Sequence, residues 1–125
     1  MTITAVDNLQ VVREYVAALS GQMKTEVIVS RFVIDPALKE HIRQAEAAFP
    51  LYRIDVAQLI GEGETVALRG IFHGVHKGEF AGLPATGRAV SADLMLFYRL
   101  QDAKIVEHWM VLDTAALMGQ LTAQG

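Results

Sequence analysis

The chain has 125 residues, of which 52% are hydrophobic and 20% are charged, a size and composition typical of one globular domain, expected here to span residues 1–125. The formal net charge is −3 and the basic residues are scattered, which argues against a nucleic-acid partner. The absence of cysteine excludes disulfides, thiolate metal sites and thiol nucleophiles. No signal-peptide pattern and no apolar run of about eighteen residues is present, so we expect a cytoplasmic protein without a membrane partner.

The first half of the chain has mostly helical periodicity. Residues 7–20 predict a helix that begins with a capping aspartate and ends before Gly21. Residues 36–49 predict another, because Asp35 can cap a helix whose first residue is proline. Between them, residues 25–34 are rich in β-branched side chains without clean alternation. They predict either a strand or a short helix running into a strand.

From residue 51 onward the apolar period changes to two, which predicts four strands: LYRIDVAQLI, TVALRGIFHGVH, AVSADLMLFYRL and KIVEHWMVL. They are separated by GEGE, KGEFAGLPATGR and QDA, all of turn-forming composition. A last helix is expected over residues 114–121. Helices followed by an antiparallel sheet predict an α+β fold, in which the helices cover one face of the sheet and a pocket lies between the two layers.

Two motifs stand out in the second half of the chain, HGVHKGEFAGLPATGR and KIVEHWMVLDTAALMGQL. The first resembles the G-T-H-x-G-x-F-x-G-x-P-x-T-G-(R/K) stretch of SnoaL-like proteins. The second resembles their K-I-x-E-x-W-x-x-x-D ending followed by L-x-x-Q-L. The positions that match the first motif are Gly74, His76, Gly78, Phe80, Gly82, Pro84, Thr86, Gly87 and Arg88. The resemblance covers roughly residues 50–121.

The resemblance to the SnoaL-like polyketide cyclase family implies the nuclear transport factor 2-like fold, a cone-shaped barrel in which a curved antiparallel sheet wraps around N-terminal helices. For the cyclases of the family it also implies an intramolecular aldol ring closure by acid–base catalysis, with neither a metal nor a cofactor. The acid/base aspartate of the family's ending falls on Asp113. The substrate need not be a polyketide, because one fold hosts many functions.

Asp113 is the first candidate for catalysis. Alternation along the strand puts it on the same face as Trp109. If that face is concave, the carboxyl group lies beside an aromatic wall, where desolvation raises a carboxyl pKa and suits it to acid–base work. The alternative is that Asp113 only caps the last helix.

The histidines give weaker signals. His76 matches the family motif and is a candidate to orient a substrate oxygen or to share a proton with Asp113; the alternative is a strand-end histidine bonded to a loop. His73 and His76 are three residues apart on a strand and point to opposite faces, so no metal site is expected. His108 should face away from whatever Trp109 faces. His41 either borders the pocket or, more commonly for such a position, lies on an exposed flank.

The expected pocket would bind an apolar small molecule. Its candidate lining residues are Trp109, Phe80, Arg69, Met95, Phe97 and Tyr15. Arg69 either pairs with an anion in the cavity or faces solvent, because an unpaired buried charge is costly. In the loop between the second and third strands, Phe80 and Leu83 are the apolar residues, and we expect them to be anchored inward at the pocket rim.

Three functions remain open at this stage. The first is a cofactor-independent cyclase or isomerase that moves a proton next to a carbonyl group, with Asp113 as the acid/base. The second is a hydrolase or lyase in the same pocket, and the third is a non-catalytic ligand-binding or dimerising domain. Apolar residues occupy both parities of the third strand, for example Leu94 and Leu96 against Met95 and Phe97. Both faces of the sheet therefore need cover, which predicts a two-fold homodimer through the convex face.

Overall fold

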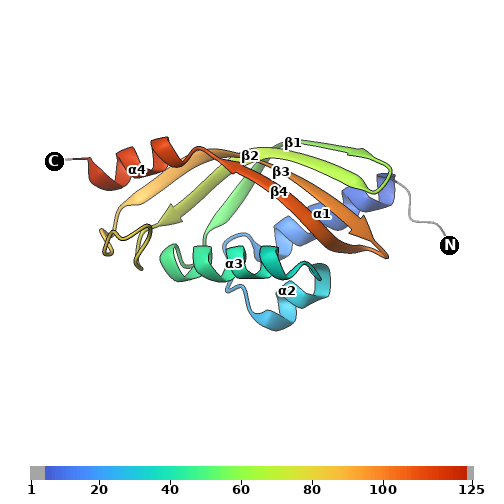
Figure 1. Cartoon of the computed structure of the whole chain (residues 1–125), viewed down its shortest axis with the longest axis horizontal. Helices are drawn as coiled ribbons and strands as arrows, with labels where there is room; N and C mark the ends of the chain where they lie inside the picture. The colour runs from blue at the N-terminus through green and yellow to red at the C-terminus, as the bar shows by residue number, and fades with distance from the viewer. Residues whose placement is uncertain (1–4, 124–125) are drawn as a thin grey trace.

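The computed structural model describes residues 5–123 and has the α+β architecture expected from the sequence (Figure 1). Three helices precede a curved four-stranded antiparallel sheet of order β1-β2-β3-β4, and a fourth helix follows it. The elements are α1 (Ala5–Leu19), α2 (Glu26–Phe32), α3 (Pro36–Ala48), β1 (Arg53–Glu62), β2 (Thr65–Val75), β3 (Ala89–Gln101), β4 (Lys104–Leu112) and α4 (Thr114–Thr122). None of the helices in these residues is long and apolar enough to cross a membrane.

The N-terminal helices follow their local capping signals with one exception. Helix α1 begins at Ala5, so Asp7 lies in its first turn and the expectation that Asp7 is the N-cap was wrong. The undecided segment forms the short helix α2, because the Thr25 hydroxyl accepts a hydrogen bond from the Ile28 amide at 3.3 Å and caps its start. Val33 then pairs with Ile105 in an isolated β-bridge. This segment is therefore a helix that runs into an extended residue.

The two faces of the sheet are most distinct on β3, where residues alternate between buried and exposed positions. The even-numbered residues from Val90 to Leu100 are buried and face the layer that contains α1 and α3. The odd-numbered residues point to the opposite, outer face. Cross-strand pairing extends both sets across the sheet, since Tyr98 pairs with His108 and Phe97 pairs with Trp109.

Large apolar side chains remain exposed on the outer face. We call the set that lies on the three central and C-terminal strands the outer patch; it consists of Ile71, Met95, Phe97, Trp109 and Val111. The exposed fraction is 53% for Phe97 and 54% for Trp109. Apolar patches of this kind are uncommon on the surface of a monomer unless they bind something.

The loop between β2 and β3 is anchored to the C-terminal end of α3. Phe80 packs against Phe49 with the ring centroids 5.2 Å apart, and its backbone exchanges two hydrogen bonds with that of Leu83. Both side chains are partly buried against the core, so the expected inward anchoring is confirmed, but neither lines the cavity between the helices and the sheet. Gly78 is required here, because a Cβ atom at this position would lie 2.1 Å from the Ala47 carbonyl oxygen.

Candidate active site

A small cavity of about 100 Å³ lies between the inner face of the sheet and helices α1 and α3. We call it the inner cavity. Its wall is mostly aliphatic and aromatic, and His41 and Met110 are its exposed members, which places them at its open side. The lining residues are Tyr15, Leu38, His41, Ile42, Ala45, Tyr52, Ile54, Phe72, Leu94, Leu96, Tyr98, Met110 and Leu112. Apart from the tyrosines, His41 is the one titratable side chain among these described lining residues.

Three buried tyrosines, Tyr15, Tyr52 and Tyr98, form part of the wall. The rings of Tyr15 and Tyr98 meet edge to face with their centroids 5.8 Å apart. Burial raises the pKa of each of the three phenols, because a phenolate is poorly solvated there. All three are therefore neutral at physiological pH, and their hydroxyl groups can donate hydrogen bonds to a ligand oxygen.

At the open side of the cavity, three side chains form a hydrogen-bonded chain. The Asp35 Oδ2 atom lies 2.7 Å from His108 Nδ1, and His108 Nε2 lies 3.0 Å from His41 Nδ1. The inner two members are well shielded, with 11% of the Asp35 side chain and 5% of the His108 side chain exposed. The two imidazole rings are almost perpendicular, at 85°. We call this arrangement the Asp35–His108–His41 chain.

Asp35 is held as an ionised acceptor. Its Oδ1 atom caps α3 by accepting a hydrogen bond from the Ala37 amide at 2.9 Å, so only Oδ2 is directed toward His108. Burial alone would raise the pKa of this carboxyl group, but the hydrogen bonds from His108 and from the amides of Ala37 and Leu38 outweigh it and lower the pKa below its usual value. The carboxylate therefore serves both as a helix cap and as an anchor for His108.

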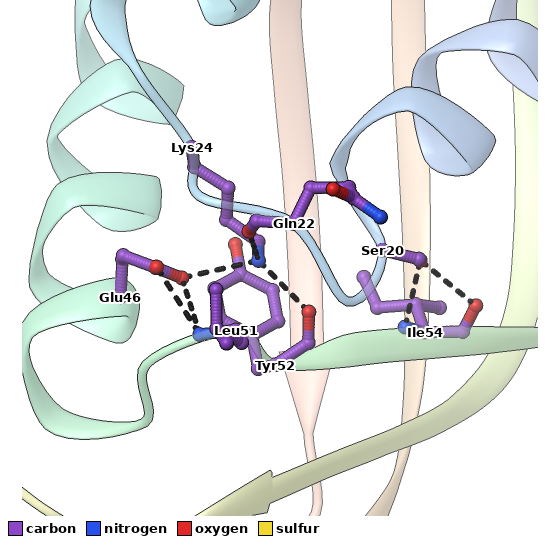
Figure 2. Close-up of polar contacts among 7 residues, drawn as sticks. All are labelled: Ser20, Gln22, Lys24, Glu46, Leu51, Tyr52 and Ile54. Carbon is purple, nitrogen blue, oxygen red and sulfur yellow. Dashed lines mark hydrogen bonds and ion pairs between the residues drawn. The ribbon is translucent and has the colours of Figure 1, made fainter.

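Lys24 packs on Tyr52, one of the wall residues, and reaches Glu46 (Figure 2). Its buried side chain lies over the Tyr52 ring, with Nζ 4.0 Å from the ring centroid, and Nζ donates to the carbonyl oxygens of Gln22 and Tyr52 at 2.8 Å. Nζ also lies 3.0 Å from a carboxylate oxygen of Glu46 on α3. Burial lowers the pKa of Lys24, and the hydrogen bond to Glu46 opposes this effect. The contacts tie the start of β1 to α3 and so fix Tyr52.

Asp113 does not line the inner cavity. Its Oδ1 atom accepts a hydrogen bond from the Ala116 amide at 3.0 Å and caps α4. The residue is exposed in a hollow of about 400 Å³ on the outer face, which Arg69 and Asp93 also line. Asp113 therefore lies on the face opposite the inner cavity, and the capping geometry considered as the alternative is present.

The other sequence candidates divide between the two faces. Trp109, Met95 and Phe97 lie in the outer patch, and Arg69 points outward with its Nε 3.4 Å from Gln58 Oε1. They do not contribute to the inner cavity, because their strand parity is opposite to that of the core residues.

Two further candidates lie in or next to the anchored loop. His76 is fully buried, with Nδ1 bonded to Thr86 of that loop, and neither His76 nor Phe80 lines the cavity. Tyr15 is the one lining candidate that the structure places in the inner cavity wall.

The Asp35–His108–His41 chain was not expected from the sequence. Asp35 was expected only as a helix cap, and His41 was expected either at the border of the pocket, where it lies, or on an exposed flank. One usable signal was present: His108 must face away from Trp109, and an inward histidine on an apolar wall is expected to have a partner. Within residues 5–123, no group of three or more histidine, aspartate and glutamate side chains is arranged to hold a metal ion.

Comparisons with known proteins point to one family. The family model described as SnoaL-like polyketide cyclase matches residues 8–121. AclR from Streptomyces galilaeus, a proposed hydroxylase, is 27% identical with a TM-score of 0.81, and the match covers 94% of this chain and 82% of AclR. A SnoaL-like polyketide cyclase from Agrobacterium tumefaciens strain C58 is 26% identical with a TM-score of 0.74, covering 94% and 98% of the two chains.

A proposed SnoaL-like polyketide cyclase from Jannaschia sp. CCS1 is 17% identical over 100% of this chain and 98% of its own, with a TM-score of 0.84, which reflects a shared fold. Among curated proteins there is no match.

Proposed function

The chain belongs to the SnoaL-like polyketide cyclase family, and from this premise we propose that it is a cofactor-independent enzyme that moves a proton next to the carbonyl group of a small neutral molecule bound in the inner cavity. The observation that carries the proposal is the composition of the cavity wall: apolar side chains and neutral tyrosines, with His41 at the open side. Such a wall favours an uncharged ligand, because a charged one would lose its hydration without a partner.

The size of the cavity limits the substrate. Ligand pockets for drug-sized molecules usually measure roughly 300–1,000 Å³, whereas the inner cavity measures about 100 Å³. An engineered apolar cavity of about 150 Å³ in another protein takes up benzene. We therefore expect a substrate of about one ring, which is much smaller than a polycyclic polyketide.

The chemistry follows from the groups at the wall. A neutral imidazole can accept a proton from the carbon atom next to a carbonyl group and return it elsewhere on the molecule. A tyrosine hydroxyl can donate a hydrogen bond to the oxygen atom on which negative charge develops. This division of tasks needs neither a metal nor a cofactor, and it serves an isomerisation and an aldol ring closure equally.

The test is proton exchange from small cyclic ketones in D₂O, such as cyclopentanone and cyclohexanone, followed by proton NMR. The protein should accelerate the loss of the signal from the protons next to the carbonyl group. Ala45→Leu, which fills the cavity, should abolish the acceleration, whereas Ala47→Leu at an exposed position of the same helix should preserve it. Exchange no faster than in buffer would refute the enzymatic proposal; binding without exchange would leave a ligand-binding domain.

We also infer a two-fold homodimer through the outer face of the sheet. The outer patch presents five large apolar side chains to solvent, and a second copy is the occupant that a self-complementary patch fits. Charges of both signs border it, since Arg69 lies in the same hollow as Asp93 and Asp113. Two copies related by a two-fold axis can pair these opposite charges across the interface.

A further inference from the structure

We propose that His41 is the acid/base group of the inner cavity and that Asp35, acting through His108, sets which nitrogen of His41 carries the proton. The proposal rests on the proposed function of the cavity and names the group that performs it. His41 touches the cavity and is the catalytic residue, whereas His108 and Asp35 are positioning residues.

The hydrogen-bond pattern fixes the proton positions when both histidines are neutral. Asp35 is ionised and can only accept, so His108 must carry its proton on Nδ1 and donate it to Oδ2. The Nε2 atom of His108 then has no proton and can only accept a hydrogen bond, so His41 must donate to it from Nδ1. The remaining nitrogen, His41 Nε2, is left without a proton. Within the described residues it makes no protein hydrogen bond, so it can act as the base.

The same chain can carry the positive charge away from the substrate. When His41 Nε2 takes a proton from the substrate carbon, the Nδ1 proton of His41 can pass to His108 Nε2. His108 then becomes an imidazolium between Asp35 and His41, and His41 is neutral with its proton on Nε2. The electron pair of the broken C–H bond is delocalised onto the carbonyl oxygen as an enolate. Nε2 then returns its proton to another atom of the substrate while His108 Nε2 gives the Nδ1 proton back to His41, which restores the starting state of both rings. The positive charge that forms on His108 lies next to the Asp35 carboxylate, since His108 Nδ1 is 2.7 Å from Asp35 Oδ2.

Other titratable groups face this chain from three elements. Glu40 lies next to His41 on α3, and its pKa is lowered mainly by its ion pair with Arg43 and slightly by His41. Tyr98 on β3 is the cross-strand neighbour of His108, and Tyr15 on α1 lies against Tyr98. Both phenols are neutral near pH 7 because burial raises the pKa of each. The carboxylate hydrogen-bonded to this pair of histidines is therefore that of Asp35, which contacts His108 directly and His41 only through His108.

The first experiment reads the proton positions directly and needs no substrate. Nitrogen-15 NMR of the histidine side chains distinguishes a protonated ring nitrogen from a bare one. In a spectrum recorded at a pH where both rings are neutral, His108 and His41 should both carry the proton on Nδ1. A proton on Nε2 of either residue in the wild-type protein would overturn the proposal.

The second experiment uses Asp35→Asn to reverse the direction of both hydrogen bonds in the Asp35–His108–His41 chain. In Asp35→Asn the side-chain oxygen is still required by the Ala37 amide, so the NH₂ group must face His108. His108 Nδ1 then becomes an acceptor, its proton moves to Nε2, and His41 in turn carries its proton on Nε2. A merely structural role of Asp35 would not move both protons. Unchanged proton positions in folded Asp35→Asn would contradict the assignment; if this variant fails to fold, the wild-type spectrum decides.

The third experiment measures the ketone exchange rate. His41→Gln should lose about a hundredfold or more of the protein's acceleration, and Asp35→Asn should also be slow, because its His41 Nε2 is already protonated. His73→Gln is the matched control, since His73 pairs with Asp55 outside the cavity. Full exchange by His41→Gln, with loss in Ala45→Leu, would overturn the role of His41 and leave the proposed function standing. No exchange by the wild-type protein would remove both.

Discussion

Two neighbouring rows of residues cross the same sheet and have opposite surroundings. One row is Leu59, Leu68, Leu96 and Met110, which faces the helices; the next is Ile60, Ala67, Phe97 and Trp109, which faces outward. Both rows are almost entirely apolar, so hydrophobicity does not distinguish them. The inner row is defined by the packing of α1 and α3 over it, and the outer row is left without a helix (Figure 1). The helices, rather than the strands, determine where a ligand and its chemistry can lie.

The largest expected difference between the rows is in stability. Leu96 is almost fully buried, and Leu96→Ala should lower the free energy of unfolding by about 2–5 kcal/mol, from lost burial and the space left behind. Ile60→Ala, at the exposed edge of the outer row, should change it by about 0.5 kcal/mol or less. Urea denaturation of both variants measures the difference. Equal losses would mean that the outer row is also packed in the free subunit.

The second prediction concerns what covers the outer row. Trp109→Lys places a charge in the middle of the outer patch and should weaken a dimer through this face by roughly 2 kcal/mol or more, as for a central interface residue. Sedimentation at micromolar concentration should show a dimer for the wild-type protein and a shift toward monomer for the variant. Val27→Lys, at an exposed apolar residue of α2 outside the outer patch, should keep the dimer. A monomeric wild-type protein would remove the homodimer proposal.

Some elements of the fold could be predicted from local sequence signals, and others could not. The helix over 36–48 and the four strands were predictable, because Asp35-Pro36, the turn segments and the period of two are local signals. Residues 25–34 were not, because their β-branched side chains favour strands, whereas the Thr25 cap and burial of Val29 and Phe32 favour the short helix that forms.

The candidate site was less accessible to sequence reasoning. Alternation placed Trp109 and Asp113 on the same face of the sheet, but it could not tell which of the two faces the helices cover. His41 and His108 are 67 residues apart in the sequence, and only the packing of α3 on the inner face brings them within 3.0 Å. The motif that suggested Asp113 describes the end of β4 and the cap of α4, and it gives no information on which residues of α3 lie opposite.

The third prediction uses pH to probe the inner face. The pKa values of Tyr15, Tyr52 and Tyr98 are raised above about 10 in the folded protein, mainly by burial. Their contribution to stability is fully present below the unfolded pKa of about 10 and is lost as the pH rises above it, because the unfolded chain releases the protons first. Each tyrosine contributes a slope of up to about 1.4 kcal/mol per pH unit. The pKa of Lys24 is lowered, so its contribution to the free energy of unfolding rises with pH below about 10.5, opposite to that of the tyrosines.

Urea denaturation between about pH 8 and pH 11 tests whether the free energy of unfolding falls with pH, since the tyrosines of the unfolded chain titrate near 10. The free energy of unfolding should fall steeply above about pH 10, and Tyr98→Phe should make that fall shallower by about one tyrosine's share. Tyrosinate absorbance should rise together with unfolding rather than before it. Ionisation of all three phenols in a still folded protein would show that the inner wall is open to water.

The smallest effect separates capping from catalysis at Asp113. Asn and Asp are similar N-cap residues, so Asp113→Asn should leave stability almost unchanged, whereas Asp113→Ala should lose about 1 kcal/mol of capping at α4. Because Asp113 lies on the outer face, both variants should keep the ketone exchange rate of the wild-type protein, in contrast to His41→Gln. Thermal unfolding and the exchange assay together provide the measurement. If Asp113→Asn were stable but lost a hundredfold or more of the exchange rate, the outer hollow rather than the inner cavity would hold the reacting carbonyl group, and the family motif would have indicated the acid/base residue correctly.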